Sequence, residues 1–290
     1  MDSPTGLSER KLTCVTATFN VLASGNGEAL RRCLASVSRL SVPHEHLIYD
    51  GASTDGTAEL LRELARTTPD VKVVSERDSG IYNALNKGVR DARGTWFHVL
   101  GADDEIVDAA TMEETLAEGE RRKAGLVASP AWWGKVGGRV YPVQPQLALG
   151  AMPFPHQGVL MRTELVRSLG GFVETLRLGA DKNLLLSAVL ANARVVCLDR
   201  PFALFGDQGV SSDGERCRQE NVDFYAMHYG LSPEESLELY DRRVLPLRVA
   251  FRKLVHASPV VRRSARFYLM RGMLDLLGLL DAHGSVRVLR

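Results

Sequence analysis

The chain contains no apolar run long enough to span a membrane. Its very apolar segment at 267–280 is interrupted by Arg271 and Asp275, whereas about 18–20 uncharged apolar residues are needed to cross a bilayer. The opening sequence MDSPTGLSER also lacks the basic and apolar regions of a secretory signal. We therefore expect a cytoplasmic protein that is either free or peripheral on the inner face of the cytoplasmic membrane.

Cysteine is scarce as well. Only Cys14, Cys33, Cys197 and Cys217 occur in 290 residues, and none lies in a Cys-x-x-Cys motif. Disulfide frameworks belong to short secreted chains. We interpret all four as reduced thiols, in agreement with a cytoplasmic location.

Charge is nearly balanced but unevenly distributed. The formal net charge is +1. Residues 242–290 hold eleven Lys and Arg against two Asp, so residues 1–241 carry an excess of eight acidic side chains. This segregation predicts an acidic body and a basic C-terminal extension with separate tasks.

Strands and helices alternate in the first hundred residues. Apolar, β-branched runs predict strands, and apolar residues at helical spacing predict helices. The expected strands are 11–19, 46–50, 71–75 and 95–100, and the expected helices are 28–40, 57–65 and 82–90. Strands that are apolar throughout form a parallel sheet covered on both faces. The predicted fold class is therefore α/β, with a doubly wound, mostly parallel, Rossmann-like sheet.

The pattern changes after Asp104. Helices are expected at 111–123, 163–169 and 180–190, strands at 125–129, 156–162 and 195–201, and a hairpin at 133–142 that turns on Gly137 and Gly138. Only helical patterns follow Ser212. We therefore divide the chain into an α/β domain at 1–215 and a helical C-terminal extension at 216–290.

One motif resembles a dinucleotide-binding fingerprint. Gly25 and Gly27 follow a strand, and Asp50 ends the next one, as in a GxGxxG motif with its ribose-binding acid. The third glycine position holds Leu30, however, and the glycines come six residues after Phe19 instead of directly after the strand. A nicotinamide-dependent oxidoreductase is therefore only weakly indicated.

Acidic residues follow three of the predicted strands. Asp50 ends the second strand, Asp78 follows the third, and Asp103 and Asp104 follow the fourth. Ligands of doubly wound sheets bind beyond the carboxyl ends of the strands, so we expect these side chains in one crevice. Adjacent carboxylates repel unless a cation neutralises them, and Mg²⁺ or Mn²⁺ accepts one or two carboxylates together with substrate phosphates. The alternative is that Asp103 and Asp104 only cap the next turn.

A set of ordered motifs makes the chain similar to a known family. The motifs are TATFN at 16–20, DGASTDGT at 50–57, SERDSGIYNALNKG at 75–88, LGADD at 100–104, HQG at 156–158, LGGF at 169–172 and AD at 180–181. In this order they resemble the family 2 glycosyltransferases of the GT-A fold, and the resemblance extends from residue 11 to residue 215. It implies that the domain at 1–215 is an inverting catalytic domain that uses a nucleotide-sugar donor.

The resemblance also implies residue roles. The residues that it assigns to the nucleotide sugar are Thr16, Thr18, Asn20, Asp50, Asp78, Gly80, Asn86, Lys87 and Asp103. Thr16, Thr18 and Asp50 would line the nucleobase pocket. Asp103 would reach the ribose, Asp104 would hold the Mg²⁺ or Mn²⁺ at the phosphates, and Asp181 would be the general base.

Two interpretations stay open for each of four residues: Asp181 and three further candidates for the acceptor or metal site. Asp181 begins a predicted helix, where it would also serve as an N-cap. His156 is either a structural residue or a ligand of the acceptor or the metal. Trp132 and its neighbour Trp133 either stack on an acceptor sugar or pack in the hairpin.

The chain departs from the family pattern in three places. Gly51 stands where many relatives have a second acid, Asn83 stands where Asp is frequent, and the QxxRW signature of processive relatives is absent. The nucleobase therefore stays open, and transfer of a single sugar is expected.

The expected function is metal-dependent, inverting transfer to a hydroxyl of a glycan or polyprenyl-linked acceptor, in the synthesis of cell-surface polysaccharide. The alternatives are a non-catalytic nucleotide-sugar-binding scaffold and a nucleotidyltransferase. No nucleic-acid partner is expected.

The C-terminal extension combines basic and apolar residues at helical spacing. Leu245, Val249 and Phe251 are interleaved with Arg248 and Arg252. Basic amphipathic helices lie on anionic membrane surfaces, which makes such a surface an expected partner. The alternative is that the extension packs on the catalytic domain or on a dimer partner.

Overall fold

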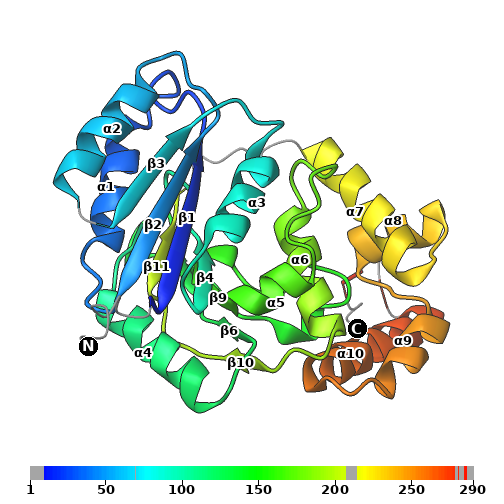
Figure 1. Ribbon diagram of the computed structural model, residues 1–290. Coiled ribbons are helices and arrows are strands. Elements are labelled where there is room, and N and C mark those ends of the chain that lie inside the picture. The colour runs from blue at the N-terminus through cyan, green and yellow to red at the C-terminus, as the bar shows by residue number, and fades with distance from the viewer. Residues whose placement is uncertain (1–9, 69, 207–213, 278–279, 281–283, 286–290) are drawn as a thin grey trace.

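The computed structural model describes residues 10–68, 70–206, 214–277, 280 and 284–285. Its first half alternates strands β1 (Leu12–Thr18), β2 (His44–Asp50), β3 (Val71–Ser75) and β4 (Trp96–Val99) with helices α1 (Gly27–Val37), α2 (Thr57–Thr67) and α3 (Ile81–Asp91) (Figure 1). β1 pairs in parallel with β2 and β4, and β2 pairs in parallel with β3. The predicted alternation and the parallel sheet are both confirmed.

Three later strands complete this sheet. They are β6 (Leu126–Ala128), β9 (Val159–Arg162) and β10 (Val195–Cys197), and the strand order is β10-β6-β9-β4-β1-β2-β3. β9 runs antiparallel to its neighbours β4 and β6. The connecting helices are α4 (Ala109–Arg121), α5 (Thr163–Ser168) and α6 (Ala180–Leu190). The sheet is thus mostly parallel, as predicted.

Alternate side chains of each strand enter different cores, because successive Cβ atoms point to opposite faces of a sheet. On β2, Leu47 and Tyr49 belong to the core beneath α3, α5 and α6, and Ile48 belongs to a core beneath α1 and α2. Figure 1 shows these two sets of helices on opposite faces of the sheet. Burial on both faces explains why the strands are apolar throughout.

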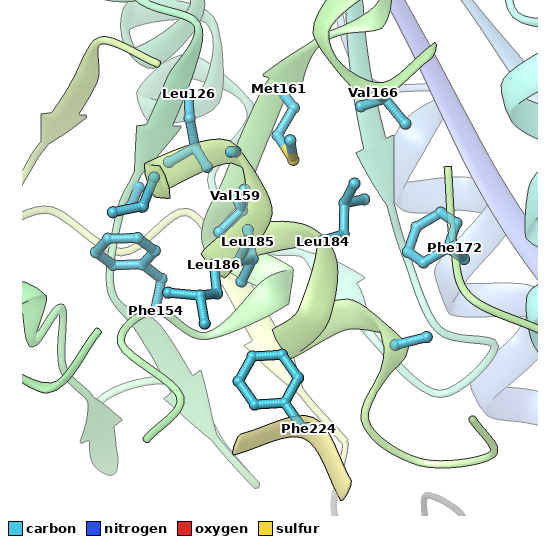
Figure 2. Close-up of a cluster of buried hydrophobic side chains, with 14 of the residues drawn as sticks. Leu126, Phe154, Val159, Met161, Val166, Phe172, Leu184, Leu185, Leu186 and Phe224 are labelled. Atoms are coloured by element: carbon cyan, nitrogen blue, oxygen red, sulfur yellow. The ribbon is translucent and has the colours of Figure 1, made fainter. Parts of the chain in front are cut away.

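The larger core lies between the sheet and α6 (Figure 2). Leu126, Val159 and Met161 from the strands face three consecutive leucines of α6, and Phe224 of α7 lies on the other side of α6. The three leucines are Leu184, Leu185 and Leu186. A helix that is apolar all round is buried on several sides. This burial fixes the position of the residues at the start of α6.

A second, smaller sheet is built from short strands. Its order is β5 (Glu105–Ile106), β11 (Ala203–Phe205), β7 (Ala131–Trp133) and β8 (Arg139–Tyr141). β7 and β8 form the predicted hairpin, whose loop contains Gly134 and Gly137 at φ of 70° and 76°. β5 and β11 were not predicted. Two other segments are short 3₁₀ helices, η1 (Pro145–Leu147) and η2 (His156–Gly158). The strand predicted at 156–162 is therefore corrected, because its first three residues form η2 and the strand β9 begins at Val159.

Four helices follow: α7 (Gly214–Tyr229), α8 (Pro233–Arg242), α9 (Leu247–Leu254) and α10 (Pro259–Leu276). The predicted helical extension is therefore present. Tyr225, Leu239, Val249 and Tyr268 join the same hydrophobic cluster as the sheet residues above. Within the described ranges, every helix is too short or too polar to cross a membrane.

Candidate active site

Asp50 organises the carboxyl ends of β1, β2 and β3. It is 1% exposed and accepts hydrogen bonds from Thr18 Oγ1 at 3.2 Å and Ser75 Oγ at 2.7 Å. It also accepts from Ser53 N at 3.0 Å and Ser53 Oγ at 2.5 Å. The predicted pair of Thr18 and Asp50 therefore lies together, and Asp50 fixes the loop that follows it.

Asn20 secures the same loop from the end of β1. Its φ is 48°, a left-handed conformation that asparagine adopts more readily than most residues. Its Oδ1 accepts from Thr54 N at 2.9 Å, and its backbone N donates to Ser53 Oγ at 2.8 Å. Asn20 thus positions the loop after β2 against the end of β1.

Thr16 lies inside the sheet and not in the crevice. It has no exposed surface, and its hydroxyl donates to the Leu100 carbonyl at 2.8 Å. The hydroxyl also lies 2.9 Å from His46 Nε2. The expectation that Thr16 lines a nucleobase pocket is therefore corrected, since its hydroxyl joins β1 to the end of β4.

Phe19 was missed as a candidate from the sequence. It is an aromatic residue directly after β1, and it is 66% exposed. A Cβ atom on Gly51 would lie 3.2 Å from Phe19 Cδ2 and 3.0 Å from Asp78 Oδ2. Asp78 therefore occupies the space in which an acidic side chain at position 51 would lie, which accounts for the glycine there.

Asp78 and Gly80 shape the start of α3. Asp78 Oδ1 accepts from Gly80 N at 3.0 Å. Gly80 has a φ of 136°, which favours glycine, and α3 begins at the next residue, Ile81. The N-terminus of α3 therefore opens at the carboxyl ends of the strands, where free N–H groups favour anions.

Asn86 and Lys87 have protein partners. The Asn86 amide donates to the Phe172 carbonyl and to Glu174 Oε1, both at 2.9 Å, and its Oδ1 accepts from Phe172 N at 2.8 Å. Lys87 Nζ lies 2.8 Å from Glu76 Oε1. These two residues thus hold α3 against neighbouring loops, which the sequence resemblance did not indicate.

Asp104 is held by backbone groups on two sides. It is 2% exposed, its Oδ2 accepts from Gly101 N at 3.0 Å, and its Oδ1 accepts from Gly206 N at 3.0 Å. A Cβ atom on Gly206 would lie 2.5 Å from Asp103 Oδ2 and 2.6 Å from the Asp103 carbonyl oxygen. The segment after β11 therefore packs directly on both acids.

His156 connects Asp104 to Asp181. Its Nε2 lies 3.7 Å from Asp104 Oδ2, and its Nδ1 lies 3.4 Å from Asp181 Oδ2. Burial disfavours the charged imidazole, but hydrogen bonds and charge from Asp104 and Asp181 outweigh burial and raise the pKa of His156 to about 10. The imidazolium lies between the two carboxylates and neutralises part of their charge.

Asp181 is the second residue of α6, not its N-cap. The N-cap is Gly179, which has no side chain, and its backbone N donates to Glu220 Oε2 of α7 at 3.0 Å. Asp181 Oδ1 accepts from the adjacent Lys182 N at 2.7 Å, and its side chain is 27% exposed. The capping interpretation is therefore wrong, and Oδ2 points toward His156.

The two tryptophans of the hairpin lie on opposite faces of the small sheet, because successive side chains of a strand alternate. Trp133 is paired in register with Phe205 and with Arg139. Its ring centroid lies 5.0 Å from that of Phe205, which in turn lies 6.4 Å from the His156 ring. The candidate from the sequence, Trp132, occupies the other face.

A cation would find a partial set of ligands here. No cluster of three or more His, Cys, Asp or Glu side chains in the described part of the chain is arranged to hold a metal alone. Asp104 Oδ2 supplies a carboxylate oxygen, and His156 Nε2, 3.7 Å away, becomes a possible ligand only when the imidazole has released its proton. The Asp104 carboxylate fits Mg²⁺ or Mn²⁺ when substrate phosphates complete the coordination.

A family model matches the N-terminal part of the chain. The profile of the family described as Glycosyl transferase family 2 matches residues 13–171, more than half of the chain. A PGL/p-HBAD biosynthesis glycosyltransferase of Mycobacterium bovis (strain BCG / Pasteur 1173P2) is 34% identical over 116 residues, which are 39% of this chain and 43% of that protein. The chain thus matches less than half the length of this relative. The uncharacterized glycosyltransferase EpsJ of Bacillus subtilis (strain 168) is 24% identical over 255 residues, covering 76% of this chain and 73% of EpsJ.

Solved structures share the fold. The crystal structure of S. aureus TarS 1-349 matches with a TM-score of 0.62 and 17% identity, and covers 96% of each chain. The mannosyltransferase PcManGT from Pyrobaculum calidifontis, in complex with GDP-Man and Mn²⁺, matches with a TM-score of 0.61 and 19% identity, over 93% of this chain and 75% of the other. The predicted GT-A fold is therefore confirmed.

Proposed function

Because the chain belongs to glycosyl transferase family 2, we propose that it moves one sugar from a nucleoside-diphosphate sugar to an acceptor hydroxyl with inversion. The observation that carries this proposal is the position of His156 between Asp104 and Asp181. One carboxylate suits a cation at the diphosphate, and the other suits a proton acceptor. Both carboxylates therefore lie close to one imidazole ring, at 3.7 Å and 3.4 Å, which supports a single site that uses both of them.

The donor is proposed to bind along the ends of β1 to β4. Phe19 is exposed there and offers a ring on which a nucleobase can stack, next to the buried carboxylate of Asp50. The N-terminus of α3 at Gly80 favours the diphosphate. Relatives of the same fold were solved with UDP-GlcNAc and with GDP-Man, which supports a nucleoside-diphosphate sugar as the donor class.

Asp104 is proposed to hold Mg²⁺ or Mn²⁺ together with the donor phosphates, and His156 would join it only after its imidazolium has released a proton. When bound, such a cation stabilises the negative charge that develops on the leaving diphosphate. Gly101 N and Gly206 N keep the Asp104 carboxylate in one orientation, because each donates to a different oxygen. The protein therefore presents this ligand before the donor arrives.

Asp181 is proposed as the general base. The acceptor oxygen attacks the anomeric carbon, its proton passes to Asp181 Oδ2, and the bond from the anomeric carbon to the diphosphate oxygen breaks. The nucleoside diphosphate leaves with the bonding electrons. The burial of α6 on several sides holds Asp181 in place for this transfer.

The test is the Asp181→Asn variant. We expect its transfer rate to fall by roughly 10²–10⁴-fold, the usual contribution of a positioned proton acceptor, while donor affinity stays within a few-fold of wild type. Transfer and donor hydrolysis are measured with a panel of UDP and GDP sugars and Mn²⁺. Normal turnover by the variant would refute the base assignment. Donor binding without turnover by wild type would favour the scaffold alternative.

The acceptor is proposed to be a glycan or a lipid-linked saccharide of the cell surface. The mycobacterial relative carries PGL/p-HBAD biosynthesis in its name. We propose further that the enzyme works at an anionic membrane surface. The C-terminal helices supply the structural argument for that location.

Basic residues of the C-terminal helices fall into two groups. Arg242 pairs with Glu238 and Asp275, and Arg248 pairs with Glu235. Four others are exposed and make no ion pair within the described ranges: Arg252, Arg262, Arg263 and Arg266. Arg287 and Arg290 lie outside the described residues. Pairing with acids therefore accounts for only part of the basic extension.

The unpaired arginines of α10 continue into an exposed apolar stripe. Arg262, Arg266, Met270, Met273 and Leu277 are spaced three or four residues apart and all are exposed, so they share one helix face. Met270 and Met273 are 55% and 57% exposed, and Leu277 is 70% exposed. A basic and apolar face of this kind suits the headgroup region of an anionic bilayer.

Vesicle flotation tests the location. Changing Arg262, Arg263 and Arg266 to Gln removes about 3 kcal/mol of attraction to an anionic leaflet, at about 1 kcal/mol each. We expect binding to phosphatidylglycerol vesicles to fall about a hundredfold. The matched control changes three exposed cations elsewhere, Arg31, Arg66 and Lys123, to Gln. Equal losses in both variants, or no binding by wild type, would contradict the membrane location.

A further inference from the structure

One face of the small sheet carries three aromatic side chains, Phe205, Trp133 and Tyr141, which we call the aromatic row. This row leads toward Asp181, the proposed general base. Phe205 of β11, Trp133 of β7 and Arg139 of β8 are paired in register, so their side chains stand side by side on one face. Tyr141, two residues after Arg139, is on the same face and lies edge-on to Trp133, with ring centroids 6.2 Å apart. This row was not expected from the sequence, because β11 was not predicted.

The aromatic row reaches the residues around the proposed general base. Phe205 contacts Trp133 on one side and lies 6.4 Å from the His156 ring on the other. His156 is in turn 3.4 Å from Asp181 Oδ2. Tyr141 is also close enough to Asp181 that burial and the Asp181 charge together raise its pKa. A ligand ring that lies on Phe205 and Trp133 would therefore have its edge at the proposed base.

Packing alone does not account for Trp133. The residue Trp133 stays 36% exposed. Arg139 lies over it at 5.2 Å from the ring centroid, and Arg139 forms no ion pair with any residue that the structure describes. An exposed tryptophan held between a cation and a second aromatic ring is a rigid, preorganised surface for a ligand.

We propose that this aromatic row is the acceptor subsite, and that the accepting hydroxyl belongs to a pyranose ring. The inference rests on the proposed function, which places the general base at Asp181. One face of a pyranose carries C–H groups, which pack on an aromatic ring, and its hydroxyls project from the edge. A pyranose on Phe205 and Trp133 can therefore direct a hydroxyl toward Asp181, while the nucleotide sugar occupies the side of Asp104.

The geometry also excludes the neighbouring tryptophan from this role. Trp132 pairs in register with Val140 on the opposite face of the hairpin. It differs from Trp133 by one position in sequence and shares the same strand. This makes Trp132 a matched control for the same chemical change on the wrong face.

The experiment measures binding and transfer in the full-length protein. Octyl glycosides of glucose, galactose and mannose, and p-cresol as a non-sugar ring, are titrated with nucleoside diphosphate and Mn²⁺ present while tryptophan fluorescence is followed. We expect a saturable change with at least one glycoside and not with p-cresol. The change should disappear in Trp133→Phe, which keeps a ring, and persist in Trp132→Phe.

Transfer assays supply the second readout. Trp133→Ala should raise the acceptor KM about tenfold, equivalent to about 1.4 kcal/mol, and should lower the ratio of transfer to donor hydrolysis by a similar factor. Trp132→Ala, checked for thermal stability, should leave that ratio within twofold to threefold of wild type. Equal effects of both variants, a response to p-cresol alone, or no response to any glycoside would overturn the subsite. Failure of wild type to cleave any donor would instead overturn the proposed function.

Discussion

At the scale of single residues, Asp104 has two tasks. Its carboxylate is proposed to bind the cation, and it also accepts two backbone N–H groups, from Gly101 and Gly206. Both oxygens are therefore used to close the turn after β4 onto the segment after β11. Substitution of this residue should consequently affect stability as well as turnover.

We predict that Asp104→Asn loses nearly all divalent-dependent turnover and is also less stable by about 1–3 kcal/mol, the usual penalty for a buried polar group without its partner. The amide NH₂ would face one of the two N–H donors and could not accept from it. Turnover against Mn²⁺ concentration and urea unfolding measure the two effects. Wild-type activity in excess chelator would disprove the metal assignment.

Lys182, next to the proposed base, is half-buried and has no carboxylate at ion-pairing distance in the part of the chain that the structure describes. Its Nζ contacts Asn221 and donates to Tyr225 OH at 2.9 Å. Burial, with a smaller contribution from the charge of Arg243, lowers the pKa of Lys182 to about 7 from its ordinary 10.5. Protonated Lys182 therefore opposes folding.

This shift predicts a dependence of stability on pH. Between pH 7 and the ordinary pKa of 10.5, the unfolded chain keeps the Lys182 proton and the folded chain has released it. Folding stability therefore rises with pH, by up to about 1.4 kcal/mol per unit for this group. We expect the stability of wild type relative to Lys182→Met to increase from pH 7.0 to 8.5 in urea unfolding. A difference that stays constant over this range would contradict the lowered pKa.

Single residues also mark the limit of prediction from sequence. Asp50, Asp103 and Asp104 could be found because each follows a strand that the apolar pattern locates. Phe19 was missed, and Trp133 was considered beside Trp132 without a reason to prefer either, since an aromatic residue next to a strand is equally consistent with core packing. Their exposure depends on elements that are distant in the sequence.

At the scale of elements, the small sheet connects the acids to the acceptor side. β11 ends at Phe205, and the next residue, Gly206, donates to Asp104. β5 and β11 contain two and three residues, which is too short for a periodic pattern to develop. The long helices and the parallel strands were predictable because their own sequence patterns specify them. By contrast, β5 and β11 are strands only because they pair with segments that are distant in the sequence.

We predict that Gly206→Ala damages the site more than the fold. A Cβ atom at this position would lie 2.6 Å from the Asp103 carbonyl oxygen, so backbone at the acids must move. We expect the donor KM to rise at least about tenfold, because small displacements of catalytic groups reduce rates strongly. Steady-state kinetics and thermal unfolding of the variant give the comparison. Unchanged kinetics would show that the segment after β11 adapts freely.

At the scale of the whole molecule, the sheet and the C-terminal helices share one core. Tyr225, Leu239, Val249 and Tyr268 belong to the same buried cluster as Leu126 of β6. The sequence correctly predicted a helical extension. Its division from the catalytic domain at residue 215 stays a prediction, because a composition change does not reveal which side chains pack together.

We predict that truncation before Leu247 abolishes stable folding. It removes Val249, Val261, Ala265 and Tyr268, all of which are at most 1% exposed. Loss of one such large apolar side chain typically destabilises a protein by about 2–5 kcal/mol. Expression and circular dichroism of the truncated chain check this. A folded, active truncation would show that the helices are dispensable. As a control, changing Arg262, Arg263 and Arg266 of α10 to Gln should leave the melting temperature nearly unchanged, because these side chains are exposed.

The shared core also has a consequence for synthesis on the ribosome. The strand face that bears Leu126, Val159 and Met161 is covered once α6 has been made, but the helices α7 to α10, which share its core and pack beyond α6, are encoded up to about eighty residues later. At roughly 5–20 residues per second, translation needs about 4–16 seconds to add that segment. During this interval the nascent chain exposes an apolar surface, and a chaperone that binds such surfaces would shield it until Tyr268 emerges.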